Sequence, residues 1–201
     1  MHTIDLISSN ALAVRATVPV VARVRPSDMS LPTPCAEWDL GQLLAHMTVQ
    51  HLGFAAAAAG RGGDLDTWQP RPMGDNPAQE YAQAAESVIA AFAEPGVLDR
   101  GLLLPEMTTQ PIPGRLAIGF HLVDYVVHGW DVARTLGIAY EAPPEVLTAA
   151  LPIAEAVPDG AARLAPGSVF APRVPVAGDD PLDRILALLG RDPGKNVVPP
   201  R

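Results

Sequence analysis

The sequence predicts a mainly α-helical protein, an antiparallel four-helix bundle followed by a short C-terminal extension. Two observations support this fold class. Four substantial stretches carry apolar residues at helical spacing, and the connections between them are modest in length. The chain has 201 residues, which is enough for one domain with a complete hydrophobic core. We expect the bundle to span residues 1–158 and the extension, residues 159–201, to pack on it.

The first two helices are predicted from apolar spacing and from their end signals. Apolar positions recur at helical spacing over about residues 4–24, where Pro19 predicts a kink. A loop rich in proline and serine follows. The second helix is expected over about residues 40–59, because Asp39 and Gln42 form a capping-box pattern at its start.

The middle of the chain predicts two more bundle helices separated by an extended segment. An irregular loop leads to a third helix that starts at Pro77 and stops before Pro95. Residues 97–113 are expected to be extended, as a hairpin or a lid. The fourth helix is predicted over about residues 115–136 and ends at Gly137.

The last third of the chain predicts smaller elements. A fifth helix is expected from about residue 143 to residue 157. The tail then contains a short extended stretch, residues 169–176, and a last helical piece over residues 181–189.

Composition excludes several classes of partner. The net charge of -8 argues against binding nucleic acid or an anionic membrane, since either would need a basic face. Small molecules or proteins are the better match. The single cysteine, Cys35, excludes an intramolecular disulfide and a zinc site made of several thiolates. No signal-peptide pattern and no apolar run of membrane-spanning length is present, so we expect a cytoplasmic protein.

The fourth predicted helix carries the most informative pattern in the sequence. Residues 116–133 are apolar nearly all round, yet they include His121, Asp124, His128 and Asp131. At 100° per residue these four side chains fall within an arc of about 80°. Imidazoles and carboxylates are costly to bury unless they are paired or bind a metal. The stripe therefore predicts either a metal site or a buried hydrogen-bond network.

The second predicted helix offers two histidines that spacing alone does not separate. His46 and His51 are five residues apart and point about 140° away from each other, so they do not suit one metal together. His51 lies on the apolar stripe of Leu43, Leu44 and Met47. His46 lies off that stripe, where it could face a polar cavity between helices.

Three segments resemble a known family. They are TPCAEWDLGQLLAHM, then HLVDYVVHGWDVARTLG, then FAPRVPVAGDDPLDRILALLGRDP, and together they cover most of the chain in order. They are similar to the mycothiol-dependent maleylpyruvate isomerase-like branch of the DinB/YfiT-like superfamily, in particular to its short actinobacterial metal-binding proteins. The resemblance implies a DinB-like bundle that holds a divalent ion, usually zinc and sometimes nickel. It implies His46, Asp124 and His128 as the ligands, with Asp124 where relatives often have the longer glutamate.

The same interpretation assigns roles to His121 and Asp131, the two remaining residues of the polar stripe. Three protein ligands leave an open coordination position, which suits catalysis better than a closed structural site. His121 is assigned as the catalytic residue, a general base, although it could instead be an extra ligand or a hydrogen-bond donor to one. Asp131 could orient a ligand imidazole.

The resemblance implies a divalent-metal-dependent enzyme that uses mycothiol, a low-molecular-weight thiol, for S-transfer or isomerisation of an electrophilic small molecule. Two alternatives stay open: a recruited biosynthetic acid/base enzyme, an isomerase or cyclase that works without the thiol and with or without the metal, and a non-catalytic metal-binding module. Family members that isomerise maleylpyruvate carry a longer C-terminal domain than the tail of this chain. A homodimer is a further expectation.

Other residues receive structural interpretations. We expect Trp38 to pack its loop onto the bundle and Cys35 to be a small buried residue. Arg134 suits the C-terminal end of the helix dipole, with an anionic ligand as the alternative. Glu106 and Arg115, near the expected lid, receive no role.

Overall fold

The computed structural model is mostly helical, as predicted, and describes residues 5–35, 38–165 and 168–195. Ala36 and Glu37, in the first of the three family-like segments, lie outside the described residues. The bundle and the two helices that follow it have these bounds: α1 Leu6–Val21, α2 Leu40–Ala58, α3 Pro77–Phe92, α4 Gly114–Leu136, α5 Pro144–Ala156 and α6 Pro181–Leu188. The expected helices are therefore all present, with ends that differ by a few residues from the predicted ones.

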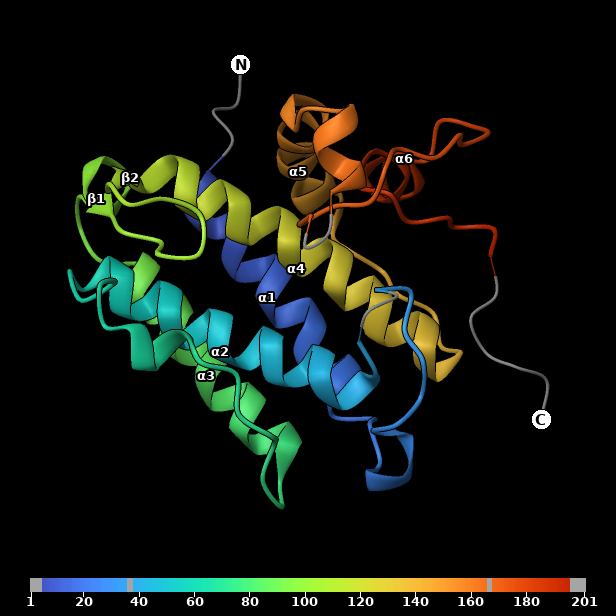
Figure 1. Ribbon diagram of the computed structural model, residues 1–201, viewed down its shortest axis with the longest axis horizontal. Helices are drawn as coiled ribbons and strands as arrows, with labels where there is room; N and C mark the ends of the chain where they lie inside the picture. Colours follow the sequence, from blue (N-terminus) through green and yellow to red (C-terminus); the bar gives the residue numbers. More distant parts are fainter. Residues whose placement is uncertain (1–4, 36–37, 166–167, 196–201) are drawn as a thin grey trace.

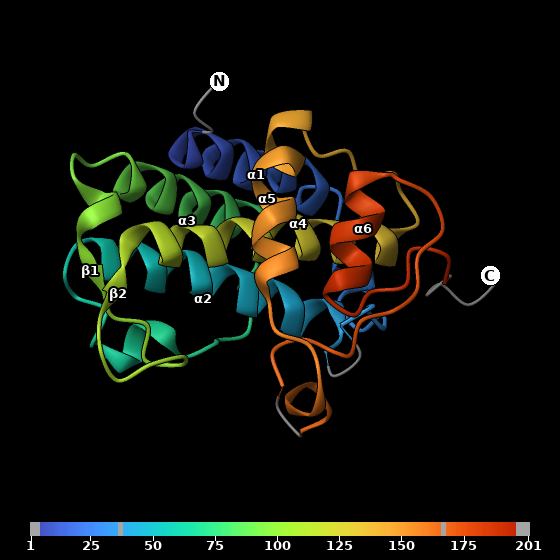
Figure 2. The ribbon, with the colours of Figure 1, turned by 90° about the horizontal axis from the view of Figure 1, so that it is seen from above.

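The four bundle helices are arranged in two pairs. Helices α1 and α4 run in one direction, and α2 and α3 run in the opposite one (Figures 1 and 2). Consecutive helices joined by short loops would alternate in direction. Here the connection over residues 59–76, which contains the 3-10 turn Leu65–Trp68, carries the chain back along α2 before α3 begins. The position of the site depends on the contact between α2 and α4.

Side chains cap the starts of three bundle helices, and the predicted capping box of α2 is one of them. The carboxylate of Asp5 accepts backbone N–H groups at the start of α1, and the side-chain oxygen of Asn76 accepts the backbone N–H of Gln79 in α3. At the start of α2, Asp39 and Gln42 each accept the other's backbone N–H, which completes the capping box. Helix α4 ends at Gly137, whose φ of 66° is left-handed.

Two apolar clusters surround the polar stripe of α4. The first fills the bundle itself and includes Leu44, Met47, Tyr81, Phe92 and Tyr125, all buried. The second covers the opposite face of α4 with α5, α6 and the residues after α6. Its buried members include Val123, Val126, Ala150, Ile185 and Leu189. Helix α4 is thus enclosed on both sides, which explains its near-uniform apolarity.

The regions predicted as extended differ from one another. Residues 97–113 contain the 3-10 turn Val97–Asp99 and a small hairpin of β1 Gly101–Leu102 and β2 Ile112–Pro113, paired antiparallel. Residues 169–176 form no strand; Val174 instead donates its backbone N–H to the carbonyl of Ala187. Two further 3-10 turns, Pro26–Asp28 and Ala161–Leu164, lie in the connections. An extended segment forms a β-strand only when it pairs with a second strand, and among the described residues no strand lies beside residues 169–176.

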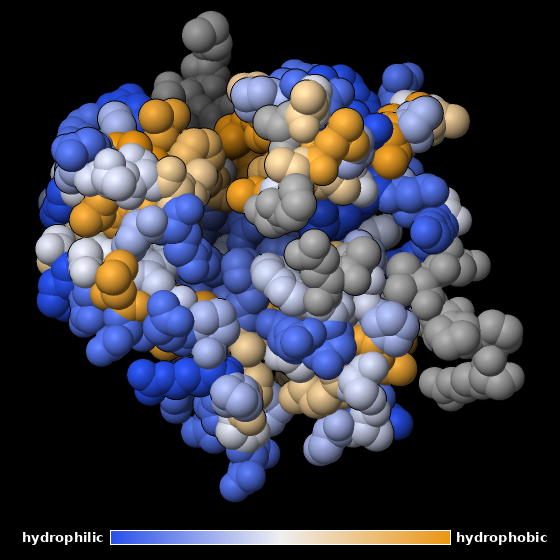
Figure 3. All heavy atoms as spheres, viewed as in Figure 1, coloured by the Kyte–Doolittle hydropathy of each residue, from blue (hydrophilic) through white to orange (hydrophobic). Residues whose placement is uncertain are grey.

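The face shown in Figure 3 is mostly hydrophilic. Exposed apolar side chains on the described surface include Leu116 on α4 and Leu164 and Val169 in the segment after α5. Within the described ranges, no helix combines the length and apolarity required to cross a bilayer.

Gly53 of α2 allows the indole of Trp68 to lie directly against the helix. A Cβ at this position would lie 2.5 Å from the Trp68 ring, which is buried and donates its N–H to the carbonyl of Gly62 at 2.9 Å. We expect Gly53→Ala to reduce the free energy of unfolding by about 1–3 kcal/mol, because the indole must move. Urea titration measures the change. The matched control is Gly41→Ala in the same helix, where the nearest atom is 3.4 Å from the added carbon. Equal stability changes in the two variants would contradict this packing argument.

Candidate metal centre

Helices α2 and α4 cross the bundle side by side in opposite directions, and two contacts fix their register. The hydroxyl of Tyr125 donates to the carbonyl of Met47, and the rings of His51 and His121 meet one turn away. In this register His46 lies opposite the turn between Asp124 and His128. The structure thus brings together three of the residues that the sequence analysis singled out.

The three side chains form a compact group of donor atoms. One ligand atom from each of His46, Asp124 and His128 lies within 4.8 Å of the other two. The Nε2 atom of His128 is 3.3 Å from Oδ1 of Asp124, and the rings of His46 and His128 meet edge to face with centroids 5.4 Å apart. Two imidazoles and one carboxylate are a donor set that suits zinc and other first-row divalent ions.

The group is covered on one side and reachable on another. The ring of Trp38 packs against His46 with a centroid distance of 4.4 Å, so the loop before α2 is attached to the bundle as expected. The side chain of His128 is 6% exposed and that of Asp124 is 26% exposed. Asp124 and His46 are thus the partly exposed members of the group, and His128 is the buried one.

Charges and burial give the two histidines of the group different protonation states. Burial lowers the pKa of His46 to about 4, although the charge of Asp124 opposes the shift. Burial also acts to lower the pKa of His128, but Asp124 and Asp131 outweigh it and raise this pKa to about 9. Burial would raise the pKa of Asp124, yet the charge and hydrogen bond of His128 hold it below its usual value. At neutral pH, His46 thus presents a free lone pair beside an ionised carboxylate.

Asp131 lies where the sequence analysis expected a residue that orients a ligand. Its Oδ2 atom is 2.9 Å from Nδ1 of His128, so the other ring nitrogen faces Asp124. Asp131 is fully buried and is paired in turn with Arg191, which follows α6. Arg191 is the residue of this centre that the sequence analysis missed. The available signal was the unpaired charge of Asp131, since a buried carboxylate needs a cation or several donors.

His51 and His121 form a second polar group inside the bundle. The Nδ2 atom of Asn10 lies 3.4 Å from the carbonyl of Ile118, so the amide nitrogen faces this acceptor and donates to Nδ1 of His121 at 3.0 Å. Nε2 of His121 then carries the proton and donates to Nδ1 of His51 at 3.2 Å. Both nitrogens of His121 are therefore engaged away from the three-residue group. Its expected role in proton transfer stays a prediction.

The remaining candidate residues have partners within the protein. Glu106 accepts a hydrogen bond from Gln50 at 2.7 Å, and Arg115 pairs with Asp99 on the surface. Arg134 donates to the backbone carbonyls of Pro193 and Lys195, and thereby holds the chain that follows α6. Cys35 is half-buried.

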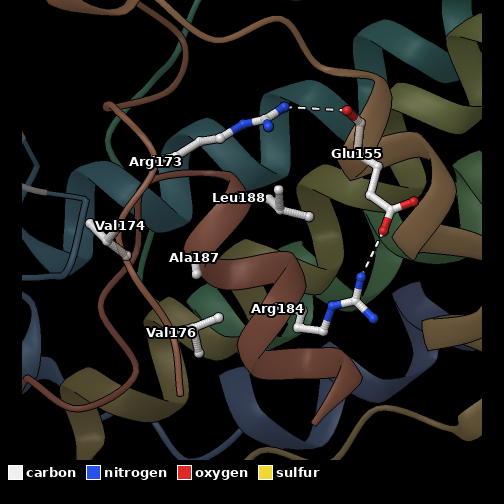
Figure 4. Close-up of a pocket in the computed structure, with 7 residues that line it drawn as sticks. All are labelled: Glu155, Arg173, Val174, Val176, Arg184, Ala187 and Leu188. Carbon is white, nitrogen blue, oxygen red and sulfur yellow. Dashed lines mark hydrogen bonds and ion pairs between the residues drawn. The ribbon is translucent and has the colours of Figure 1, made fainter. Parts of the chain in front are cut away.

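A surface cavity of about 160 Å³ lies apart from the candidate ligands, between α5, α6 and residues 173–176 (Figure 4). Its charged side chains are already engaged. Arg184 pairs with Glu155 at 2.8 Å, and Arg173 donates to the backbone carbonyls of Glu155 and Val157. The cavity therefore belongs to the contact between α5 and α6 and adds no group to the candidate centre.

Comparison with known proteins gives the family. The family model described as the mycothiol maleylpyruvate isomerase N-terminal domain matches residues 11–133, which include all of α2 and most of α4. The chain belongs to this family. Two uncharacterized Mycobacterium tuberculosis proteins, from strains CDC 1551 / Oshkosh and H37Rv, are each 28% identical over 193 residues, which are 93% of this chain and 98% of theirs.

A solved structure shows the same fold. The crystal structure of the mycothiol-dependent maleylpyruvate isomerase superposes with a TM-score of 0.53, covering 74% of this chain and 70% of that chain. Sequence identity over the match is 11%, so the likeness is one of fold. It confirms the DinB-like bundle expected from the resemblance.

The second polar group makes stability depend on pH. Burial lowers the pKa of His121 to about 3, whereas the unfolded value is near 6.5. The unfolded chain therefore binds the extra proton below pH 6.5, and the stability contributed by neutral His121 is lost progressively as the pH falls. Between pH 7.5 and pH 5.0 the wild-type protein should lose about 2 kcal/mol from this residue alone.

The variant His121→Phe, which suits the neighbouring rings of Phe54 and Phe92, should lack this loss. The difference in unfolding free energy between the metal-free wild type and the variant should therefore shrink by about 2 kcal/mol on going from pH 7.5 to pH 5.0. Urea titration at both pH values measures it. A difference that stays constant would contradict a neutral, buried His121.

Proposed function

We propose that this protein is a divalent-metal-dependent enzyme whose ligands are His46, Asp124 and His128. In this proposal it uses mycothiol for S-transfer or isomerisation of an electrophilic small molecule. The observation that carries the proposal is the convergence of three donor atoms within 4.8 Å, from two facing helices, on a side that solvent reaches at Asp124.

The residues present fit a metal ion. His46 offers a neutral lone pair, Asp124 an ionised carboxylate, and His128 a ring nitrogen whose partner nitrogen is held by Asp131. Zinc is the first expectation for two imidazoles and one carboxylate, and nickel the second. Binding at His128 displaces its proton, so affinity should rise with pH. Three protein donors leave one position for a substrate atom.

The chemistry of an open divalent site suits a thiol. When bound, the ion would lower the pKa of a thiol in the open position, so that the nucleophilic thiolate forms at neutral pH. The chain's own residues hold the donors in place and exclude water from one side through Trp38. We assign proton transfer to His121 as a prediction, and the comparison of His121→Phe with wild type in turnover assays tests it.

Membership of the family supports mycothiol as the thiol and a small molecule as the substrate. The homodimer, the cytoplasmic location and the lack of nucleic-acid binding stay predictions from the sequence. The partition of the chain at residue 158 is likewise a prediction, although α6 shares its apolar cluster with α4 and α5.

Metal content tests the ligand set. We expect tag-free protein to contain about one divalent ion per chain, and His46→Ala and His128→Ala to lose it, because each removes one of three donors. Elemental analysis before and after reloading measures this. The control is His51→Phe, which removes a histidine of the same helix that stacks on Tyr125 and belongs to the second polar group. A wild-type protein that takes up no ion, even after reloading, contradicts the metal site.

Thiol binding tests the second half of the proposal. With cobalt in place of the native ion, added mycothiol should produce a near-ultraviolet sulfur-to-cobalt absorption band. S-methylated mycothiol, which cannot form a thiolate, should produce none. An unchanged spectrum in cobalt-loaded protein would contradict thiol use. Turnover without any thiol would then favour the acid/base enzyme, and a closed coordination shell without turnover the non-catalytic metal-binding module.

A further inference from the structure

Arg191 lies in the segment that follows α6 and is almost completely buried, with 6% of its surface exposed. Two nitrogens of its guanidinium donate hydrogen bonds to one carboxylate. Nη2 donates to Oδ2 of Asp131 at 3.0 Å and Nε donates to Oδ1 at 3.2 Å. This two-point geometry is the strong form of an arginine–carboxylate pair, and a lysine cannot reproduce it.

The same carboxylate holds the imidazole of a candidate ligand. Oδ2 of Asp131 accepts from Nδ1 of His128 at 2.9 Å, so one oxygen joins Arg191 to His128. This contact leaves Nε2 of His128 to face Asp124 at 3.3 Å. A carboxylate on the far nitrogen of a metal-binding histidine fixes both the tautomer and the orientation of the ring.

The segment that carries Arg191 is itself anchored on both sides. Leu189 is buried in the apolar cluster of α4, α5 and α6. On the other side, Arg134 of α4 donates to the backbone carbonyls of Pro193 and Lys195. The segment that places Arg191 beside Asp131 is thus held against α4 at two further points, through Leu189 and through Arg134.

We propose that Arg191 is a positioning residue of the metal centre, which acts through Asp131 to hold His128 in its ligating orientation. This inference rests on the proposed function for the identity of the centre. It assigns residues 189–195, about 60 residues beyond the last helix-α4 ligand, to the same centre. Without Arg191 the buried Asp131 loses its only cationic partner other than His128 among the described residues.

The main test is the dissociation constant for zinc, measured by competition with a chromophoric chelator at fixed pH. We expect Arg191→Gln to weaken zinc binding by roughly 10- to 100-fold, and Arg191→Lys to recover part of that loss. The cobalt-loaded variants should also show altered d–d absorption. The matched control is Arg184→Gln, which removes a partly exposed arginine of α6 paired with Glu155 and should leave affinity unchanged.

A double-mutant cycle separates this role from a merely structural one. If Arg191 acts through Asp131, adding Arg191→Gln to Asp131→Asn should weaken zinc binding no further. Folded Arg191→Gln with wild-type affinity and spectrum would overturn the proposal, as would fully additive losses. If Arg191→Gln does not fold, Arg191→Lys carries the test, and unchanged affinity in that variant overturns the proposal.

A measurement without metal keeps this inference distinct from the proposed function. The ring 15N and Nδ1–H signals of His128 in metal-free protein should change in Arg191→Gln and stay unchanged in Arg184→Gln. A wild-type protein with no zinc affinity would contradict the proposed metal site, and these signals would then decide by themselves whether Arg191 positions His128. Signals identical to wild type in Arg191→Gln would count against the inference.

Discussion

The need to pair every polar group that α4 buries organises this structure. His121, His128 and Asp131 are buried on an apolar helix that is enclosed on both faces, and Asp124 is partly buried beside them, so an unpaired imidazole or carboxylate there would be costly. Their partners come from separate parts of the chain: α1 supplies Asn10, α2 supplies His46 and His51, and the segment after α6 supplies Arg191. Pairing the polar side chains of α4 therefore fixes the positions of α1, α2 and the segment after α6, which supply the partners.

The periodicity of the sequence predicted the polar stripe but not its division into two groups. An arc of about 80° places four side chains on one side of a helix, yet the stripe of α4 extends over three turns. Different neighbours meet it along its length. His51 contacts His121, whereas His46 lies close to Asp124 and His128. The register between α2 and α4 decides which histidine of α2 meets which part of the stripe.

Helix ends were the most predictable parts of the fold, because their causes are local. Asp39 with Gln42, and Gly137, act on residues within one turn of themselves. The direction of α3 relative to α2 and the position of Arg191 are not local. The first depends on how residues 59–76 return along α2, and the second on a contact between positions 131 and 191. Neither leaves a periodic signal in the sequence.

The distance along the chain between Asp131 and Arg191 also means that the residues of the candidate centre are synthesised at different times. Synthesis proceeds from the N-terminus at about 5–20 residues per second, so on the order of 3–12 s separate the two residues on the ribosome. During that interval His46, Asp124 and His128 have been synthesised, but Arg191, which pairs with Asp131, has not. In the proposed metal centre, an ion that bound before residue 191 was synthesised would meet His128 without the support that Arg191 gives to Asp131.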